Sequence, residues 1–157
     1  MFSQGRSNKG PVKSLRQRAL ECLGKREYSY HELTRKLKAF AEETDDIAAL
    51  LDDFKSRGWL SDTRFTEQLV HARQVKFGSA RVANELREKG VADDLIAGAV
   101  AHIKVNELQN ALEVWQKKYE TKPATREEWA KHARFLQSRG FGFDVIKKVL
   151  NQTRPEE

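Results

Sequence analysis

Apolar residues recur along this chain at helical spacing, and one pattern of them returns three times about fifty residues apart. When a leucine of each copy is aligned, five columns match without a gap. They contain a leucine, a small residue four positions later, an aspartate after eight, an isoleucine after ten and an aliphatic residue after fourteen. The columns are Leu37, Leu86 and Leu136; Ala41, Gly90 and Gly140; Asp45, Asp94 and Asp144; Ile47, Ile96 and Ile146; and Leu51, Val100 and Leu150.

Each column has a physical role in a pair of helices joined by a tight turn. The leucine closes the apolar face of one helix, and the small residue permits a left-handed turn at its end. The aspartate caps or charges the first turn of the next helix, whose inner face carries the isoleucine and the last aliphatic residue. Ala41 replaces glycine in the first copy, and Lys122 to Ala124 lengthen a connection in the third, so we expect those turns to differ in shape.

An additional amphipathic run precedes each helix pair, so each copy is predicted to contain three helices. The runs are residues 15–26, 62–77 and 107–119. Capping boxes, single N-cap residues and glycine stops mark further boundaries. These signals are Ser29 with Glu32, Thr125 with Glu128, Ser61 and Ser79 as N-caps, and Gly58 and Gly78 as stops.

No alternating apolar run with hairpin turns is present, so no strand is expected. The predicted fold is all-α, with three tandem three-helix repeats forming an elongated, curved helical array. The predicted repeats span residues 13–60, 61–105 and 106–152. A basic, disordered N-terminal segment, 1–12, and a disordered tail, 153–157, would flank them.

The net charge of +6 is unevenly distributed, because residues 1–30 carry seven Lys or Arg against two acidic residues. A basic bias of this size suits a polyanionic partner and equally an ordinary solvated surface. The one cysteine, Cys22, lies in an apolar pattern and is predicted to be buried. No membrane-spanning run or signal peptide is evident, so we expect a cytoplasmic protein.

Residues that could support catalysis do not form a recognisable motif. The four histidines, His31, His71, His102 and His132, share no spacing suited to a metal, and no glycine-rich phosphate loop occurs. The acidic residues cluster at helix starts and on exposed faces. We therefore predict no enzyme activity, no cofactor and no metal.

Basic residues provide the candidate binding surfaces. The best candidate is the Phe77-Gly78 bend, where Arg73, Lys76 and Arg81 could project together; alternatively, Phe77 packs inward and the cations are only solvated. The other candidates are Arg16, Arg18, Lys25, Arg26, Arg35 and Lys36 near the N-terminus, and Arg134 and Arg139 in the third copy. Trp59, Trp115 and Trp129 could stack on bases but are expected in the core.

Three segments of this chain resemble the RecX family, the bacterial regulators of the RecA recombinase. They are residues 58–65, with the sequence GWLSDTRF, residues 78–91, and residues 134–146. The chain departs from the family pattern at Trp59, Ser61 and Ala41. The resemblance implies a protein without catalytic residues that binds the RecA filament in its helical groove and suppresses strand exchange and ATP hydrolysis.

Two other functions remain open at this point. Three-helix units can present a recognition helix to a groove, so an autonomous DNA- or RNA-binding protein is an alternative. A nuclease is a third possibility, although no metal-ligand set supports it. We expect a monomer that binds single- or double-stranded DNA weakly and without sequence preference.

Overall fold

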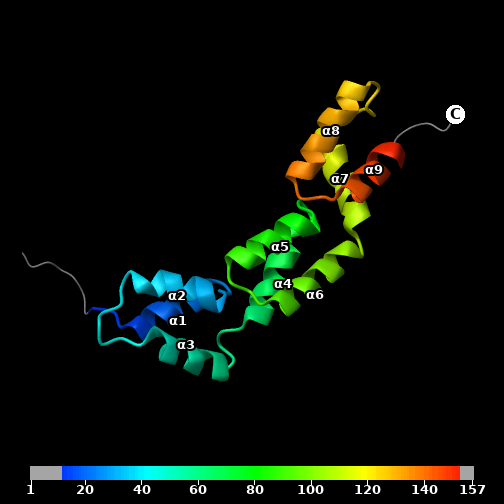
Figure 1. The fold of residues 1–157 in the computed structure, drawn as a ribbon. Helices are drawn as coiled ribbons and strands as arrows, with labels where there is room; N and C mark the ends of the chain where they lie inside the picture. Colours follow the sequence, from blue (N-terminus) through cyan, green and yellow to red (C-terminus); the bar gives the residue numbers. More distant parts are fainter. Residues whose placement is uncertain (1–11, 153–157) are drawn as a thin grey trace, which may run out of the picture. The chain divides into compact units, whose positions relative to one another are not determined.

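The structure is a computed structural model that describes residues 12–152, and this part of the chain contains nine α-helices and no strand (Figure 1). The all-α prediction is confirmed. The predicted disordered segments lie outside the described residues, apart from Val12. No helix between residues 12 and 152 combines the length and the apolar character needed to cross a membrane.

The chain divides into two compact units, with the boundary between Ser61 and Asp62. The first unit contains α1 (Leu15–Lys25), α2 (Tyr30–Lys38) and α3 (Ile47–Ser56). Its core includes the fully buried Leu33, Leu51 and Phe54. Cys22 is buried in the same core, as predicted.

The second unit contains two groups of three helices in succession. The first group is α4 (Asp62–Arg73), α5 (Ser79–Glu88) and α6 (Asp93–Lys104); the second is α7 (Glu107–Lys118), α8 (Arg126–Ser138) and α9 (Phe143–Gln152). Each group has its own core, around Leu86 and Ile103 in one and around Leu136 and Val149 in the other. The predicted helical repeat is therefore present, while the proposed repeat boundaries and the curvature of the array stay predictions.

The glycine column forms the left-handed turns expected of it. Gly90 and Gly140 have φ values of 73° and 92°, and each stands between two helices of its group. Asp94 and Asp144 lie in the first turns of α6 and α9, where their charge favours the helix N-terminus. The first unit differs, as predicted from Ala41: its N-cap is Asp46, and α3 begins only at Ile47.

Helix starts follow the capping signals in most cases. The predicted capping box of Ser29 and Glu32 is confirmed, since both of its reciprocal hydrogen bonds are present. Ser14 and Gln17 form a second capping box that the sequence analysis missed. Thr125 caps α8, but the Glu128 carboxylate accepts from the Ala124 amide rather than from its cap residue.

Two expected boundaries around the Phe77-Gly78 bend were wrong. Gly78 is itself the N-cap of α5, and Ser79 is the first residue of that helix rather than its cap. The helix before the bend, α4, ends at Arg73, four residues earlier than predicted. The amides of Gly78 and Ala80 donate to the turn after α8, a long-range contact that local propensity does not reveal.

Candidate partner-binding surfaces

The Phe77-Gly78 bend is a junction between the two groups of helices in the second unit. The Gly78 amide donates to the Arg139 carbonyl at 2.8 Å, and the Ala80 amide donates to the Gly140 carbonyl at 3.3 Å. A Cβ atom on Gly78 would lie 2.6 Å from the carbonyl carbon of Gly140. Glycine is therefore needed here for close backbone approach, and the bend packs against the α8–α9 turn.

The three cations predicted at this bend have different surroundings. The Arg73 guanidinium forms two hydrogen bonds with the Glu85 carboxylate, at 2.9 and 3.0 Å, and this contact raises the pKa of Arg73. Arg81 donates through Nη1 to the Ser138 carbonyl at 3.1 Å and lies over the Phe77 ring at 4.1 Å. Lys76 is exposed. Arg73 and Arg81 thus line one hollow with Phe77. Arg73 joins α4 to α5 within one group, Arg81 contacts the other group across the junction, and Lys76 faces solvent.

Basic residues of the first unit are also partly engaged within the chain. Arg26 pairs with Glu32 at 2.7 Å and lies 3.7 Å from the centre of the Tyr28 ring. Lys36 donates to the Tyr28 hydroxyl at 3.2 Å. Lys25 and Arg35 are exposed at the surface. These last two are the residues of the group best placed to contact a partner.

Exposed aromatic rings accompany other arginines of the first unit, a feature that the sequence analysis missed. Arg18 lies 3.8 Å from the centre of the Phe40 ring, which is 49% exposed. Trp59 was expected in the core but is 42% exposed, with Arg16 and Arg57 near its ring. Trp59 follows the left-handed turn at Gly58, so the helical periodicity of the preceding residues does not continue to it. This break in the pattern was the sign in the sequence that Trp59 need not be in the core.

The third basic group is spread over α8 and its following turn. Arg134 is exposed, whereas Arg139 is half-buried between the Phe77 and Phe135 rings, at 5.9 and 5.1 Å. On α9, Lys147 lies 5.6 Å from the exposed Phe143 ring. Arg134 is therefore the accessible member of the two predicted residues.

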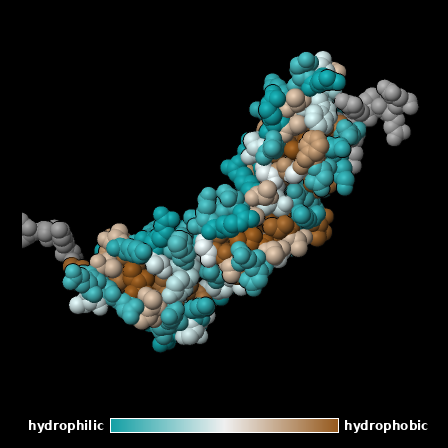
Figure 2. Space-filling view, viewed as in Figure 1, coloured by the Kyte–Doolittle hydropathy of each residue, from teal (hydrophilic) through white to brown (hydrophobic). Residues whose placement is uncertain are grey.

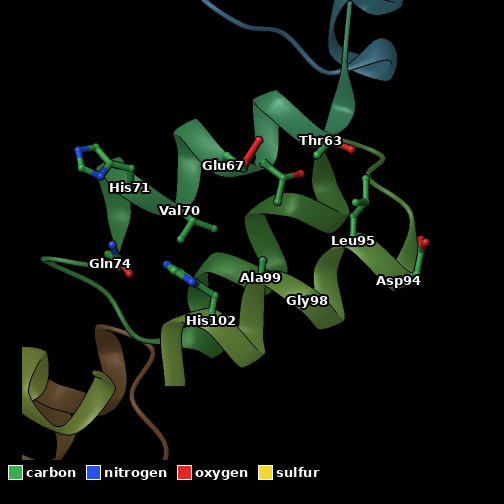
Figure 3. Close-up of a pocket in the computed structure, with 11 residues that line it drawn as sticks. Thr63, Glu67, Val70, His71, Gln74, Asp94, Leu95, Gly98, Ala99 and His102 are labelled. Atoms are coloured by element: carbon green, nitrogen blue, oxygen red, sulfur yellow. The ribbon is translucent and has the colours of Figure 1, made fainter. Parts of the chain in front are cut away.

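A surface groove of about 470 Å³ between α4 and α6 was not predicted (Figure 3). His71, Gln74 and His102 lie at one end of it, and Thr63 and Asp94 lie at the other. Its apolar lining is Val70, Leu95, Gly98 and Ala99. The lining residues come from two helices separated by α5, so the groove exists only after the group has folded.

Histidine 132 belongs to a buried aromatic cluster in the third group of helices. Trp115 Nε1 donates to His132 Nδ1 at 2.9 Å, and the Tyr119 ring stacks on His132 with centroids 3.6 Å apart. Burial lowers the pKa of His132; of the smaller effects, the charge of Glu128 raises this pKa and that of Lys131 lowers it. Within residues 12–152, no group of three or more histidine, cysteine or acidic side chains could hold a metal ion.

The helices and their repeated turns define this chain as an all-α protein built from three-helix repeats. Residues 61–100 match the family model for the second three-helix domain of RecX, and residues 106–150 match the model for its third three-helix domain. The chain belongs to the RecX family.

Curated relatives extend this match over most of the chain. The Regulatory protein RecX of Leptothrix cholodnii is 42% identical over 140 residues, which cover 89% of both chains. That of Chromobacterium violaceum is 44% identical over 138 residues, or 88% of this chain and 90% of the relative. The crystal structure of RecX from Lactobacillus salivarius has the same fold, with a TM-score of 0.76 at 18% identity over 88% of this chain and 94% of that one.

Proposed function

We propose that this protein binds the RecA nucleoprotein filament and modulates it, mainly by inhibiting strand exchange and ATP hydrolysis. The observation that carries the proposal is family membership, since relatives named Regulatory protein RecX match about nine-tenths of the chain. Exposed cations on both units suit a partner that contains nucleic acid. The protein itself would need no cofactor, and no catalytic residue is assigned to it.

The proposed contact residues are those predicted from the sequence, and their surroundings divide them into two classes. Four are exposed and have no side-chain hydrogen bond, ion pair or ring contact within the described residues, so they would contact the filament directly. The others are held by intramolecular contacts, although Arg16, Arg26, Lys36 and Arg81 are exposed as well. The exposed residues without such a contact are Lys25, Arg35, Lys76 and Arg134. The residues with internal contacts are Arg16, Arg18, Arg26, Lys36, Arg73, Arg81 and Arg139.

The proposal is tested by titrating the protein into RecA that is hydrolysing ATP on single-stranded DNA. We expect the rate of hydrolysis to fall progressively and to reach a plateau once the filament sites are occupied. A protein carrying Lys76→Glu should need a higher concentration for the same inhibition, since Lys76 is exposed and not part of the junction. An unchanged rate at saturating wild-type protein would contradict the proposed function.

The alternative is an autonomous DNA- or RNA-binding protein, which the exposed cation–aromatic pairs of the first unit favour. Co-sedimentation with RecA filaments on single-stranded DNA, compared with naked DNA, separates the two functions. Strong binding to filaments and weak, sequence-independent binding to naked DNA supports the first. Tight binding to one naked sequence supports the second.

A further inference from the structure

Gly98 lies in the middle of α6, and nothing in the fold around it requires a glycine at this position. A Cβ atom at this position would meet no other atom within 4 Å, and the backbone is not in the left-handed region. Glycine inside a helix is less favourable than alanine because more backbone entropy is lost on folding. A glycine here leaves a smooth patch on the groove between α4 and α6 where another chain can approach closely.

The same groove contains a buried polar group that lacks a partner. Thr66 is only 6% exposed, and its hydroxyl has no hydrogen-bond partner among the described residues. Buried hydroxyls are normally hydrogen-bonded, because burying one without a partner costs free energy. Thr66 lines the groove, and its buried hydroxyl could hydrogen-bond with a bound molecule that moves the surrounding side chains slightly apart.

Charge distinguishes this groove from the basic surfaces of the protein. Glu67 and Asp94 line it, and no Lys or Arg does, although the chain carries a net charge of +6. Two carboxylates repel a phosphate backbone and attract a cationic side chain. The apolar residues Val70 and Leu95 provide a surface on which an aliphatic side chain can pack.

The helix that forms one wall of the groove is apolar on more than one side. Ala97, Val100 and Ala101 line a second, shallower hollow beside α5, and Figure 2 shows hydrophobic residues reaching the surface in this part of the second unit. A helix with apolar residues around most of its circumference is usually covered by another element. In this chain much of α6 is instead exposed.

We propose that the groove between α4 and α6 binds a segment of the partner protein that carries an aliphatic side chain next to a Lys or Arg. The aliphatic side chain packs on Val70 and Leu95, and its backbone approaches α6 at Gly98. The cation pairs with Glu67 or Asp94, and a polar group hydrogen-bonds with Thr66. This assignment rests on the proposed function, and it places protein recognition in the groove and nucleic-acid contact on the basic surfaces.

The first test uses Gly98→Ala in the full-length protein, with Gly24→Ala as the matched control. Gly24 is also a helical glycine whose Cβ would meet nothing within 4 Å, and it lies in α1 of the first unit and does not line the groove. Both substitutions should raise the thermal midpoint measured by circular dichroism. Only Gly98→Ala should weaken binding to RecA filaments on single-stranded DNA, by about tenfold, because the added methyl group overfills the contact.

A second pair of variants tests the polar and charged parts of the groove. Thr66→Val keeps the side-chain shape and removes the unpartnered hydroxyl, so it should preserve or raise stability while weakening filament binding several-fold. Glu67→Lys should weaken filament binding and leave binding to naked single-stranded DNA unchanged or stronger. Glu113→Lys is the control, since Glu113 is an exposed acid on α7 outside the groove.

The outcomes distinguish the groove assignment from the proposed function. Failure of the wild-type protein to bind filaments overturns the proposed function and this assignment with it. Normal wild-type binding with unchanged affinity in Gly98→Ala and Thr66→Val overturns the groove assignment alone. An equal loss of naked-DNA binding in these variants would make the groove a nucleic-acid site, and a change in self-association would assign it to a second copy; either result overturns the proposal.

Discussion

At the scale of single residues, the immediate surroundings determine which charge state of Arg26 and His132 is favoured. Arg26 lies over the Tyr28 ring and donates hydrogen bonds to the Glu32 carboxylate, and this contact raises the pKa of Arg26. The side chain of such a cation is already oriented, so it would lose less conformational entropy on contact with a partner than an unconstrained lysine side chain would lose. His132 shows the opposite effect, because burial among aromatic rings disfavours its charged form.

The His132 environment predicts a loss of stability in mild acid. In the folded protein the pKa of His132 is below its ordinary value of about 6.5, so the unfolded chain binds the proton more readily. The stabilising contribution is therefore complete above about pH 6.5 and decreases as the pH falls toward the folded-state pKa. Tryptophan fluorescence during thermal unfolding should show a falling midpoint over this range, since protonation of Nδ1 removes the Trp115 hydrogen bond.

His132→Gln provides the control for this effect. Glutamine does not titrate, so the variant should be less stable than the wild type at pH 7.5 and should have a flatter midpoint between pH 7 and 5. A wild-type midpoint with the same pH dependence as the variant would show that His132 does not cause the change.

At the scale of helices and turns, two glycines control how the groups of the second unit fit together. Gly140 combines a left-handed backbone with close packing, because a Cβ there would collide with the Arg81 side chain and lie 2.7 Å from its amide nitrogen. Gly78 approaches the same turn from the other side. The α8–α9 turn thus has its shape for two reasons, one local and one imposed by α5.

Alanine substitutions at two left-handed glycines, Gly58 and Gly140, separate the cost of backbone strain from the cost of steric collision. Gly58→Ala introduces only strain, since Gly58 has φ 79° and open space around its Cβ direction, and it should cost about 1–2 kcal/mol. Gly140→Ala adds the collision with Arg81 and should cost at least about 1–3 kcal/mol more. Urea unfolding followed by circular dichroism measures both, and equal costs would contradict the steric contribution at Gly140.

At the scale of the whole molecule, the exposed cations are distributed over both units, while many other cations stabilise local structure. Lys25 and Arg35 lie in the first unit, and Lys76 and Arg134 lie in the second. Substitutions at exposed positions without internal contacts usually change stability by no more than about 0.5 kcal/mol, so reversing the charge of these cations should leave the fold intact. Their combined charge would instead act in binding to a filament that contains DNA.

The distribution of cations predicts how salt affects binding. The double variant Lys25→Glu/Arg35→Glu should weaken binding to RecA filaments on single-stranded DNA and make its salt dependence shallower. Removing one cation that neutralises a phosphate should change the slope of log K against log salt by about 0.7. Fluorescence anisotropy from about 50 to about 300 mM salt measures this slope. The double variant Arg16→Glu/Arg26→Glu is the comparison, and it should lower the thermal midpoint more, because these side chains have internal partners.

The sequence predicted the helical repeat because the signals that encode it are local. Leucines at helical spacing and the left-handed glycines occur within a few residues of the turns they specify, so Gly90 and Gly140 could be assigned before any packing was known. Family membership was visible for the same reason, since its motifs cover these turns. The capping boxes were predictable where the cap and its partner are three residues apart.

Tertiary structure alone decided which basic residues contact distant parts of the chain and where the groove lies. Arg81 contacts the carbonyl of Ser138, 57 positions away, and Trp59 is exposed although its composition suggested a core position. The groove joins α4 to α6, and the missing partner of Thr66 follows from packing between helices rather than from sequence spacing. Periodicity specifies which face of a helix is apolar, but only long-range packing determines which part of that face another helix covers.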